Sequence, residues 1–358
     1  MGEKNPTIAA FISRQANAVA ETMEAVVSQI QRIPRFGGPG ELQLVGSGTS
    51  FNALLATEAA LGAAAGLAVR TLTPIAFLKQ DPNLRRLSAV MVLSHSGTSA
   101  TSVAAAQTGI DLGIPTIVVT GYADSALAVL PAMRVILPIS DETVGAKTKG
   151  YTASLLALLM IARHIRGKDA AEAPELAGFV ADYRRLIVAA EGWAESFAAS
   201  LDDADAIAVM GQGRHLATAL EGALKIAEIA GIPTLPSETE DACHGRFFGY
   251  TKRTQSLFIA HTAEEKQLAA TAAAALTEFG LKAAIADLSG ASGQSPHDIA
   301  LPWPKAATIY ELDLLSAVVP FQWLAQRMAL RRGRVPEVMP YPGLSKRLGL
   351  RLVSGAAA

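Results

Sequence analysis

One strand-and-turn pattern occurs twice in this chain and constrains its fold more than any other feature. The apolar run LQLV enters the turn GSGTS, and the run AIAVM enters GQGRH, which places Gly46 and Gly211 165 residues apart. A second pair of segments, AVMVLSHSG and SLFIAHTAE, places His95 and His261 166 residues apart. Two matches at nearly the same offset predict a tandem duplication of one structural unit.

Short apolar strands alternate with helical segments in each repeat. In the first repeat, strands are expected near residues 42–46, 68–74, 89–93, 115–121 and 133–139. Strands separated by helices at this spacing favour a parallel sheet that is covered on both faces. The predicted fold class is therefore α/β, with two tandem doubly wound units whose parallel sheets are covered by helices.

This interpretation divides the chain into five parts. Residues 7–33 read as one amphipathic helix, which Pro34 and the glycines after it end. Prolines at three positions of the C-terminal segment predict that it forms no regular helix and lies as an extended arm over the site. The expected parts are an N-terminal helix (1–35), a first domain (36–168), a helical bridge (169–200), a second domain (201–335) and a C-terminal arm (336–358).

Composition excludes several classes of protein. With 31 basic and 32 acidic residues, the net charge of −1 gives no electrostatic footprint for binding nucleic acid. The most apolar windows are short or interrupted by Glu58, and the N-terminus lacks a signal-peptide pattern, so we expect a cytoplasmic protein without a membrane span. Cys243 is the only cysteine, and we expect no disulfide, metal or cofactor. Because only 18% of residues are charged, we expect association, as a homodimer or a tetramer.

The strand ends of the first repeat are rich in glycine and hydroxyl groups. In a parallel sheet such turns lead into helix N-termini, whose free N–H groups favour an anion. Neither turn fits a dinucleotide motif or a P-loop, so the pattern indicates a single phosphate group. Ser and Thr are also common helix N-caps, which would explain one such turn better than two on adjacent strands. The candidate residues are Ser47, Gly48, Thr49, Ser50, Ser94, His95, Ser96 and Ser99.

In the second repeat, ionisable side chains lie on one face of the helix after the first turn. Arg214, Thr218, Glu221, Lys225 and Glu228 follow one another at steps of three or four, among Ala, Leu, Ile and Gly. One narrow polar stripe on an otherwise apolar helix predicts burial, with the stripe facing a cavity or a partner. The alternative is an ordinary intrahelical ion pair, which would stabilise the helix by about 0.2–0.5 kcal/mol.

Together these motifs resemble the tandem sugar isomerase (SIS) family. The resemblance is carried by GSGTS, SHSG, TKGYT, LEGALKIAEI, the HG pair at 244–245 and GLSK, and it runs from about residue 8 to residue 350. The chain is similar to the isomerase half of glucosamine-6-phosphate synthase and to related phosphosugar isomerases, deaminases and deglycases. This resemblance implies two SIS units, each with a flavodoxin-like three-layer fold.

The resemblance also implies roles for individual residues. The hydroxyl-rich turns, with Val144, would hold a sugar phosphate. Glu228 would move a proton between C1 and C2, and His244, from a neighbouring subunit of a homodimer, would open the sugar ring. The remaining catalytic candidates are Lys225 and Glu221, which would orient the open chain, and Lys346, which would reach the sugar carbonyl.

The function implied is isomerisation, deamination or deglycation of an amino- or amine-substituted hexose 6-phosphate, without a glutaminase domain. Such proton transfer next to a carbonyl requires a carboxylate on one face of the substrate. The alternative is a non-catalytic regulator that binds a sugar phosphate and acts on a protein partner. Two departures from the family pattern, His95 in place of glutamine and Arg246 in place of proline, leave the sugar undetermined.

Overall fold

The computed structural model describes residues 7–37, 40–80, 87–168, 174–289, 295–304, 311–341 and 343–352. Contacts between residues divide the chain into two units. The first unit contains residues 17–143, 149–174 and 341–358, and the second unit contains residues 1–16, 144–148 and 175–340. No helix within the described ranges has both the length and the apolar character that crossing a bilayer requires.

The sheet of the first unit has five parallel strands in the order β2-β1-β3-β4-β5. Strands β3 and β4 are buried along almost their whole length, because helices cover both faces of the sheet. The strands are β1 (Glu41–Val45), β2 (Ala68–Leu72), β3 (Leu87–Leu93), β4 (Thr116–Thr120) and β5 (Met133–Ile136).

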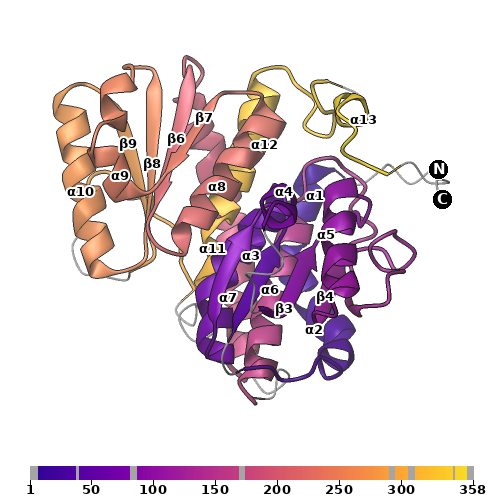
Figure 1. Ribbon diagram of the computed structural model, residues 1–358. Coiled ribbons are helices and arrows are strands. Elements are labelled where there is room, and N and C mark those ends of the chain that lie inside the picture. Colours follow the sequence, from indigo (N-terminus) through magenta and orange to yellow (C-terminus); the bar gives the residue numbers. More distant parts are fainter. Residues whose placement is uncertain are drawn as a thin grey trace. The chain divides into compact units, whose positions relative to one another are not determined.

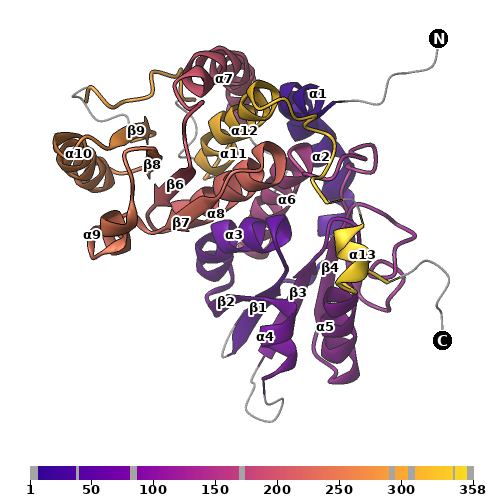
Figure 2. The ribbon, with the colours of Figure 1, turned by 90° about the horizontal axis from the view of Figure 1, so that it is seen from above.

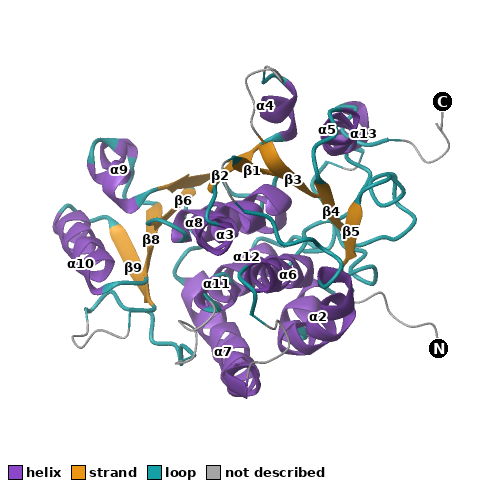
Figure 3. Cartoon of the chain, turned by 60° about the horizontal axis from the view of Figure 1, so that its bottom comes forward, coloured by secondary structure: helices purple, strands orange, loops and turns teal. Residues whose placement is uncertain are grey.

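Helices form the outer layers of the first unit. On one face of the sheet lie α4 and α5, and on the other lie α3 and α6 (Figure 3). The edge strand β5 is tied to α2, since the side-chain amide of Gln29 accepts from the N–H of Ile136 at 2.9 Å and donates to its carbonyl at 3.1 Å. The helices are α2 (Gln15–Ile30), α3 (Thr49–Ala65), α4 (Pro74–Leu78), α5 (Ala100–Asp111), α6 (Lys149–Ile165) and α13 (Leu344–Arg347).

The second unit repeats this strand order. Its four parallel strands run in the order β7-β6-β8-β9, which corresponds to β2-β1-β3-β4 of the first unit. The α/β fold class and the predicted duplication are therefore both seen in the topology, and among the described residues β5 is an addition in the first unit. The strands are β6 (Ala206–Gly211), β7 (Thr234–Ser237), β8 (Thr254–Ala260) and β9 (Lys282–Asp287).

Helices again cover both faces of the sheet in the second unit. One face carries α9 and α10, and the other carries α8 and α12 (Figure 1). Met210, Phe258 and Ile285 are among the buried side chains of the core on the α10 face. The helices are α1 (Ile8–Ser13), α7 (Pro174–Ala199), α8 (His215–Lys225), α9 (Thr239–Cys243), α10 (Ala263–Glu278), α11 (Asp313–Ala317) and α12 (Val319–Arg331), with a π turn at Ile226–Ala230 and a 3₁₀ turn at Arg246–Gly249.

Two local predictions are corrected. Residues 7–33 do not form one helix, because α1 ends at Ser13 and α2 begins at Gln15. At Arg14 the backbone N–H binds the carbonyls of both Ala10 and Ile12, and this tightened turn interrupts the helical ladder. The C-terminal arm, predicted to lack regular structure, contains the short helix α13 after the prolines.

Candidate functional site

The first strand-end turn of the first unit depends on glycine. Gly48, the N-cap residue of α3, has φ 55° and ψ −131°, a conformation that residues with a Cβ rarely adopt. A Cβ on Gly46 would lie 3.0 Å from the backbone nitrogen of Phe51. Ser47 is exposed and Ser50 is buried. Since the cap residue has no side chain to accept a hydrogen bond, the first turn of α3 is suited to receive an anion.

The second turn, after β3, uses its hydroxyl groups partly for its own structure. Oγ of Ser96 accepts hydrogen bonds from the backbone N–H and the hydroxyl of Thr98, at 3.3 and 3.0 Å. Ser99 is the N-cap of α5, and its Oγ accepts from the N–H of Ser102 at 3.4 Å. The N-cap role that the sequence left open is therefore present at Ser99. Gly97 has φ 62°, and a Cβ there would collide with Ser125.

The side chain of His95 points into the core of the first unit rather than out of the turn. It is 7% exposed, and its Nε2 lies 2.7 Å from Oγ of Ser154 on α6. The Ser154 hydroxyl donates its single proton to the carbonyl of Gly150, so Nε2 of His95 carries a hydrogen and donates to Oγ. Only the backbone of His95 is thus available to the turn, and its carbonyl accepts from the N–H of Gly121.

The segment before α6 is organised by a buried carboxylate. Glu142 is fully buried, and its two carboxylate oxygens accept from the N–H groups of Lys149 and Gly150 at 3.1 and 2.8 Å. This caps the N-terminus of α6. Val144 is buried, and its carbonyl accepts from Nζ of Lys147 at 3.0 Å. This segment therefore starts α6.

The C-terminal segment pairs with the second turn, which the sequence did not reveal. Arg351 forms an antiparallel bridge with Ser99, and the N–H of Leu352 donates to the carbonyl of Thr98 at 2.9 Å. Figure 2 shows α13, which precedes this segment, beside α5. The backbone of Arg351, an exposed residue, thereby lies next to the hydroxyl-rich turn. A single bridge between residues so distant in the chain has no sequence signature.

The polar stripe of α8 brings three predicted residues together. Nζ of Lys225 lies 2.6 Å from Oε2 of Glu228 and 3.4 Å from Oε1 of Glu221. Glu221 and Lys225 are buried, whereas the side chain of Glu228 is 25% exposed. Burial by itself would lower the pKa of Lys225, but the charges of Glu221 and Glu228 outweigh it and raise that pKa. Lys225 is therefore an ammonium ion at neutral pH.

A change of helix type places Glu228. The α-helix becomes a π turn at Ile226, one of the irregularities that occur frequently at functional sites.

The first two residues of the predicted stripe, Arg214 and Thr218, contact other partners. Thr218 contacts Nδ1 of His215, and Arg214 pairs with Asp313. The part of the stripe that forms one cluster thus begins at Glu221.

His244 lies outside the cluster around Lys225. It follows α9, its side chain is 73% exposed, and its Nε2 lies 2.7 Å from a carboxylate oxygen of Glu240. Arg246, which stands in place of the family's proline, is exposed, and its Nε donates to a carboxylate oxygen of Asp241 at 2.6 Å. Lys346 belongs to α13, but its side chain lies outside the described residues.

The two units and their sites define a duplicated, doubly wound α/β protein. One unit carries glycine- and hydroxyl-rich turns, and the other carries a Glu–Lys–Glu cluster in which Glu221 and Lys225 are buried and Glu228 is partly exposed. The chain belongs to the SIS domain family, whose model matches residues 39–163 and 200–319.

The chain is also similar in sequence to individual named proteins. The chain is 26% identical over 346 residues to glutamine–fructose-6-phosphate aminotransferase (isomerizing) of Aeropyrum pernix, covering 91% of this chain and 54% of that protein. It is 31% identical over 235 residues to the protein of the same name from Caulobacter vibrioides, covering 63% of this chain and 37% of that one. The chain thus spans about half or less of the length of these relatives.

A solved structure has the same fold. Glucosamine-6-phosphate deaminase from Thermotoga maritima superimposes with a TM-score of 0.77 at 20% identity, covering 93% of this chain and 97% of that one.

Proposed function

We propose that this chain is a phosphosugar isomerase or deaminase. It acts by aldose–ketose proton transfer on an amino- or amine-substituted hexose 6-phosphate, and deglycation of such a sugar uses the same proton transfer. The observation that carries the proposal is the contact between Lys225 and Glu228, which fixes a partly exposed carboxylate beside a buried ammonium ion. The names of the relatives, an isomerizing aminotransferase and a deaminase of glucosamine 6-phosphate, support this choice of chemistry.

The acid–base step follows from this pair. The carboxylate of Glu228 removes the proton from the carbon next to the sugar carbonyl and returns it to the neighbouring carbon, so its own protonation state is restored. The hydroxyl proton passes from one of the two sugar oxygens to the other in the same conversion. The enediolate formed between the two transfers is negatively charged. The ammonium group of Lys225 stabilises that charge, and Glu221 holds the ammonium in place at 3.4 Å. Because its pKa is raised, Lys225 acts as a cation rather than as an amine nucleophile.

The phosphate group is assigned to the turns of the first unit. Gly48 leaves the first turn of α3 without a capping side chain, and Ser47 is exposed beside it. Arg351, paired through its backbone with Ser99, adds a positive charge near the second turn. Helix N-termini and guanidinium groups both favour phosphate. His95 contributes through its backbone only, because its side chain is bound to Ser154.

Ring opening is assigned to His244, because an imidazole ring has one nitrogen that can accept a proton and one that can donate it. The His244 side chain is 73% exposed, which is consistent with a role in the site of a neighbouring subunit. We therefore infer a homodimer. We also propose that it functions in the cytoplasm. Glu240 orients the ring through Nε2.

The test compares Glu228→Gln with Glu278→Gln, a matched control at an exposed position near the end of α10. Turnover of glucosamine 6-phosphate, fructose 6-phosphate and fructosamine 6-phosphate would be measured, together with solvent exchange of the C2 proton by NMR. We expect Glu228→Gln to lower both rates about 10²- to 10⁴-fold, while the control keeps the wild-type rates. If calorimetry detects sugar-phosphate binding while wild-type chain turns over none of these sugars, the chain is a binding regulator instead.

A further inference from the structure

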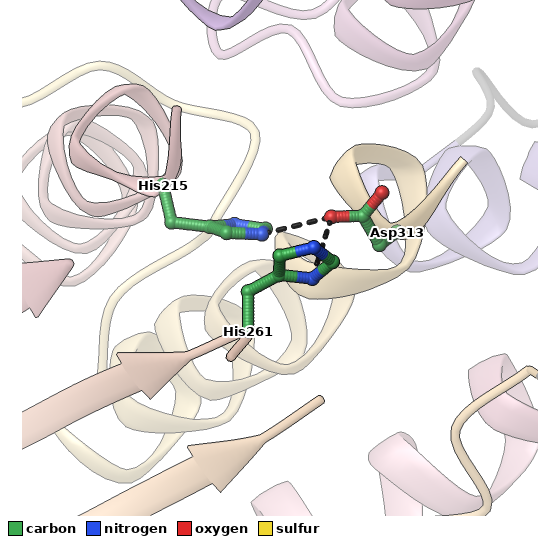
Figure 4. A group of neighbouring side chains, drawn as sticks. All are labelled: His215, His261 and Asp313. Atoms are coloured by element: carbon green, nitrogen blue, oxygen red, sulfur yellow. Dashed lines mark hydrogen bonds and ion pairs between the residues drawn. The ribbon is translucent and has the colours of Figure 1, made fainter. Parts of the chain in front are cut away.

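A second cluster of ionisable side chains lies at the strand ends of the second unit. Arg214 and His215 follow β6, His261 follows β8 directly, and Asp313 begins α11. The turns at Arg214–His215 and at His261 correspond in the repeat to the turns that carry hydroxyl groups in the first unit, where His95 matches His261. Figure 4 shows the two imidazole rings directed toward the Asp313 carboxylate. The second unit therefore carries imidazole and carboxylate side chains where the first unit carries hydroxyl groups.

The three ligand-type residues converge on one oxygen atom. Oδ2 of Asp313 lies 2.9 Å from Nε2 of His215 and 3.2 Å from Nδ1 of His261. One ligand atom from each of the three residues lies within 4.8 Å of the others. Tetrahedral Zn²⁺, with bonds of about 2.0–2.2 Å to nitrogen and oxygen, separates neighbouring ligand atoms by about 3.3 Å. The two measured separations are close to that value.

Two buried atoms of the cluster lack a hydrogen-bond partner within the described ranges, namely Oδ1 of Asp313 and Nδ1 of His261. Nδ1 of His261 is near the carboxylate but is not aligned for a hydrogen bond. Asp313 is 1% exposed, so its unpartnered oxygen has no access to bulk water. Buried polar atoms are rarely left without a hydrogen-bond partner, and coordination of an ion is one way to satisfy them. Both atoms are metal-ligand types.

Arg214 supplies the positive charge of the cluster in this structure. Its guanidinium donates to Oδ2 of Asp313 at 2.9 and 3.1 Å and to Nε2 of His261 at 2.6 Å. A second carboxylate is within reach, because Nη1 of Arg214 lies 3.7 Å from Oε1 of Glu311, whose other oxygen is buried without a hydrogen-bond partner in the described part of the chain. Arg214 can therefore leave Asp313 and keep an ion pair.

We infer that His215, His261 and Asp313 bind one divalent transition-metal ion of the zinc class when Arg214 turns to Glu311. His215 changes from the Nε2–H to the Nδ1–H tautomer, and Nδ1 then donates to Oγ1 of Thr218, which lies 3.2 Å away. The Nε2 atom of His261 accepts from Arg214 before the change, so His261 passes from the Nδ1–H to the Nε2–H tautomer, which frees Nδ1 to bind the ion. Water completes the coordination. Imidazole and carboxylate ligands suit Zn²⁺ and its neighbours in the first transition row. This site does not rest on the proposed isomerisation, which uses other residues.

The test measures Zn²⁺ binding to the full chain after chelator treatment, by metal analysis and calorimetry, with the visible spectrum of bound Co²⁺ as a report of geometry. We expect one ion per chain in the wild type and a loss of about 100-fold or more in affinity for Asp313→Asn and His261→Gln. Arg214→Gln removes the competing cation, so the Zn²⁺ affinity of this variant should be about tenfold higher than that of the wild type. His244→Ala, which removes an exposed imidazole–carboxylate pair elsewhere, should bind as the wild type does.

The Arg214→Gln result separates a metal site from a closed ion-pair network. A network that exists only to hold Asp313 gives no tighter Zn²⁺ binding when its arginine is removed. Circular dichroism checks that each variant is folded. If Asp313→Asn unfolds, His261→Gln and Arg214→Gln still decide the question, because His261 and Arg214 are only partly buried. Equal Zn²⁺ binding by the wild type, His261→Gln and Arg214→Gln overturns the inference.

Discussion

The ammonium group of Lys225 lies 3.4 Å from a carboxylate oxygen of Glu221, and neither side chain is more than 1% exposed. Two opposite charges removed from water stabilise a fold only as a pair, because either one alone would be a buried, uncompensated charge. The pair therefore links the proposed chemistry of α8 to the stability of the second unit.

Replacing Lys225 by methionine should destabilise the protein by about 3–5 kcal/mol, since Glu221 would be left buried without its cation. The measurement is urea denaturation, followed by circular dichroism. Lys282→Ala, which removes an exposed ion pair with Asp203, should change stability by less than about 1 kcal/mol. The double variant Glu221→Gln/Lys225→Met should recover part of the loss. If Lys225→Met is no worse than Lys282→Ala, the pair does not act as argued.

Gly222 should be the glycine of α8 that does not accept a side chain. A Cβ at this position would lie 2.8 Å from the ring of Phe321, which is fully buried on α12. We expect Gly222→Ala to cost about 1–3 kcal/mol, because the packed aromatic ring must move. Gly192→Ala in α7 is the matched control. Its Cβ would meet no atom within 4 Å, so this change should stabilise by about 0.4–1 kcal/mol. Thermal denaturation of both variants gives the comparison, and equal shifts would contradict it.

The sequence predicts the sheets well because their signals are local. Apolar runs followed by glycine turns identify β1, β3 and β6, and the match of SLFIAHTAE to AVMVLSHSG identifies β8. The repeat offset predicts the common strand order of the two units. The break at Arg14 is not predictable in this way, since the apolar periodicity continues across it. The helix is interrupted there because the N–H of Arg14 also binds the carbonyl of Ile12.

The sites are predicted less completely. Glu221, Lys225 and Glu228 are neighbours on one helix, so their spacing reveals them. The cluster of His215, His261 and Asp313 is different, because His215 and Asp313 are separated by 98 residues and only the fold brings them together. The direction of the His95 side chain likewise depends on Ser154, a residue of another element.

The reactivity of Cys243 should depend on pH in a way set by its neighbours. Burial raises the pKa of its thiol, and the negative charge of Glu240 raises it further. A raised pKa means that the reactive thiolate forms only at higher pH, so the midpoint of alkylation should lie above 9.0. Iodoacetamide labelling followed by mass spectrometry reports on this one thiol. Glu240→Gln should move the midpoint to lower pH, and Glu278→Gln should not. A midpoint below 9.0 in the wild type would refute the argument.

Assigning ring opening to His244 of a neighbouring subunit predicts complementation between two inactive variants. Glu228→Gln and His244→Ala would each lack one group of every site in a pure homodimer. A mixed dimer contains one site with both groups intact, so co-expression of the two variants should restore part of the turnover of a closed-ring sugar phosphate. Co-expression of Glu228→Gln with the double variant provides the control and should restore none. Native mass spectrometry establishes that mixed dimers form. If they form and remain inactive, His244 does not act across subunits, and its pairing with Glu240 at 2.7 Å belongs to the surface of a single chain.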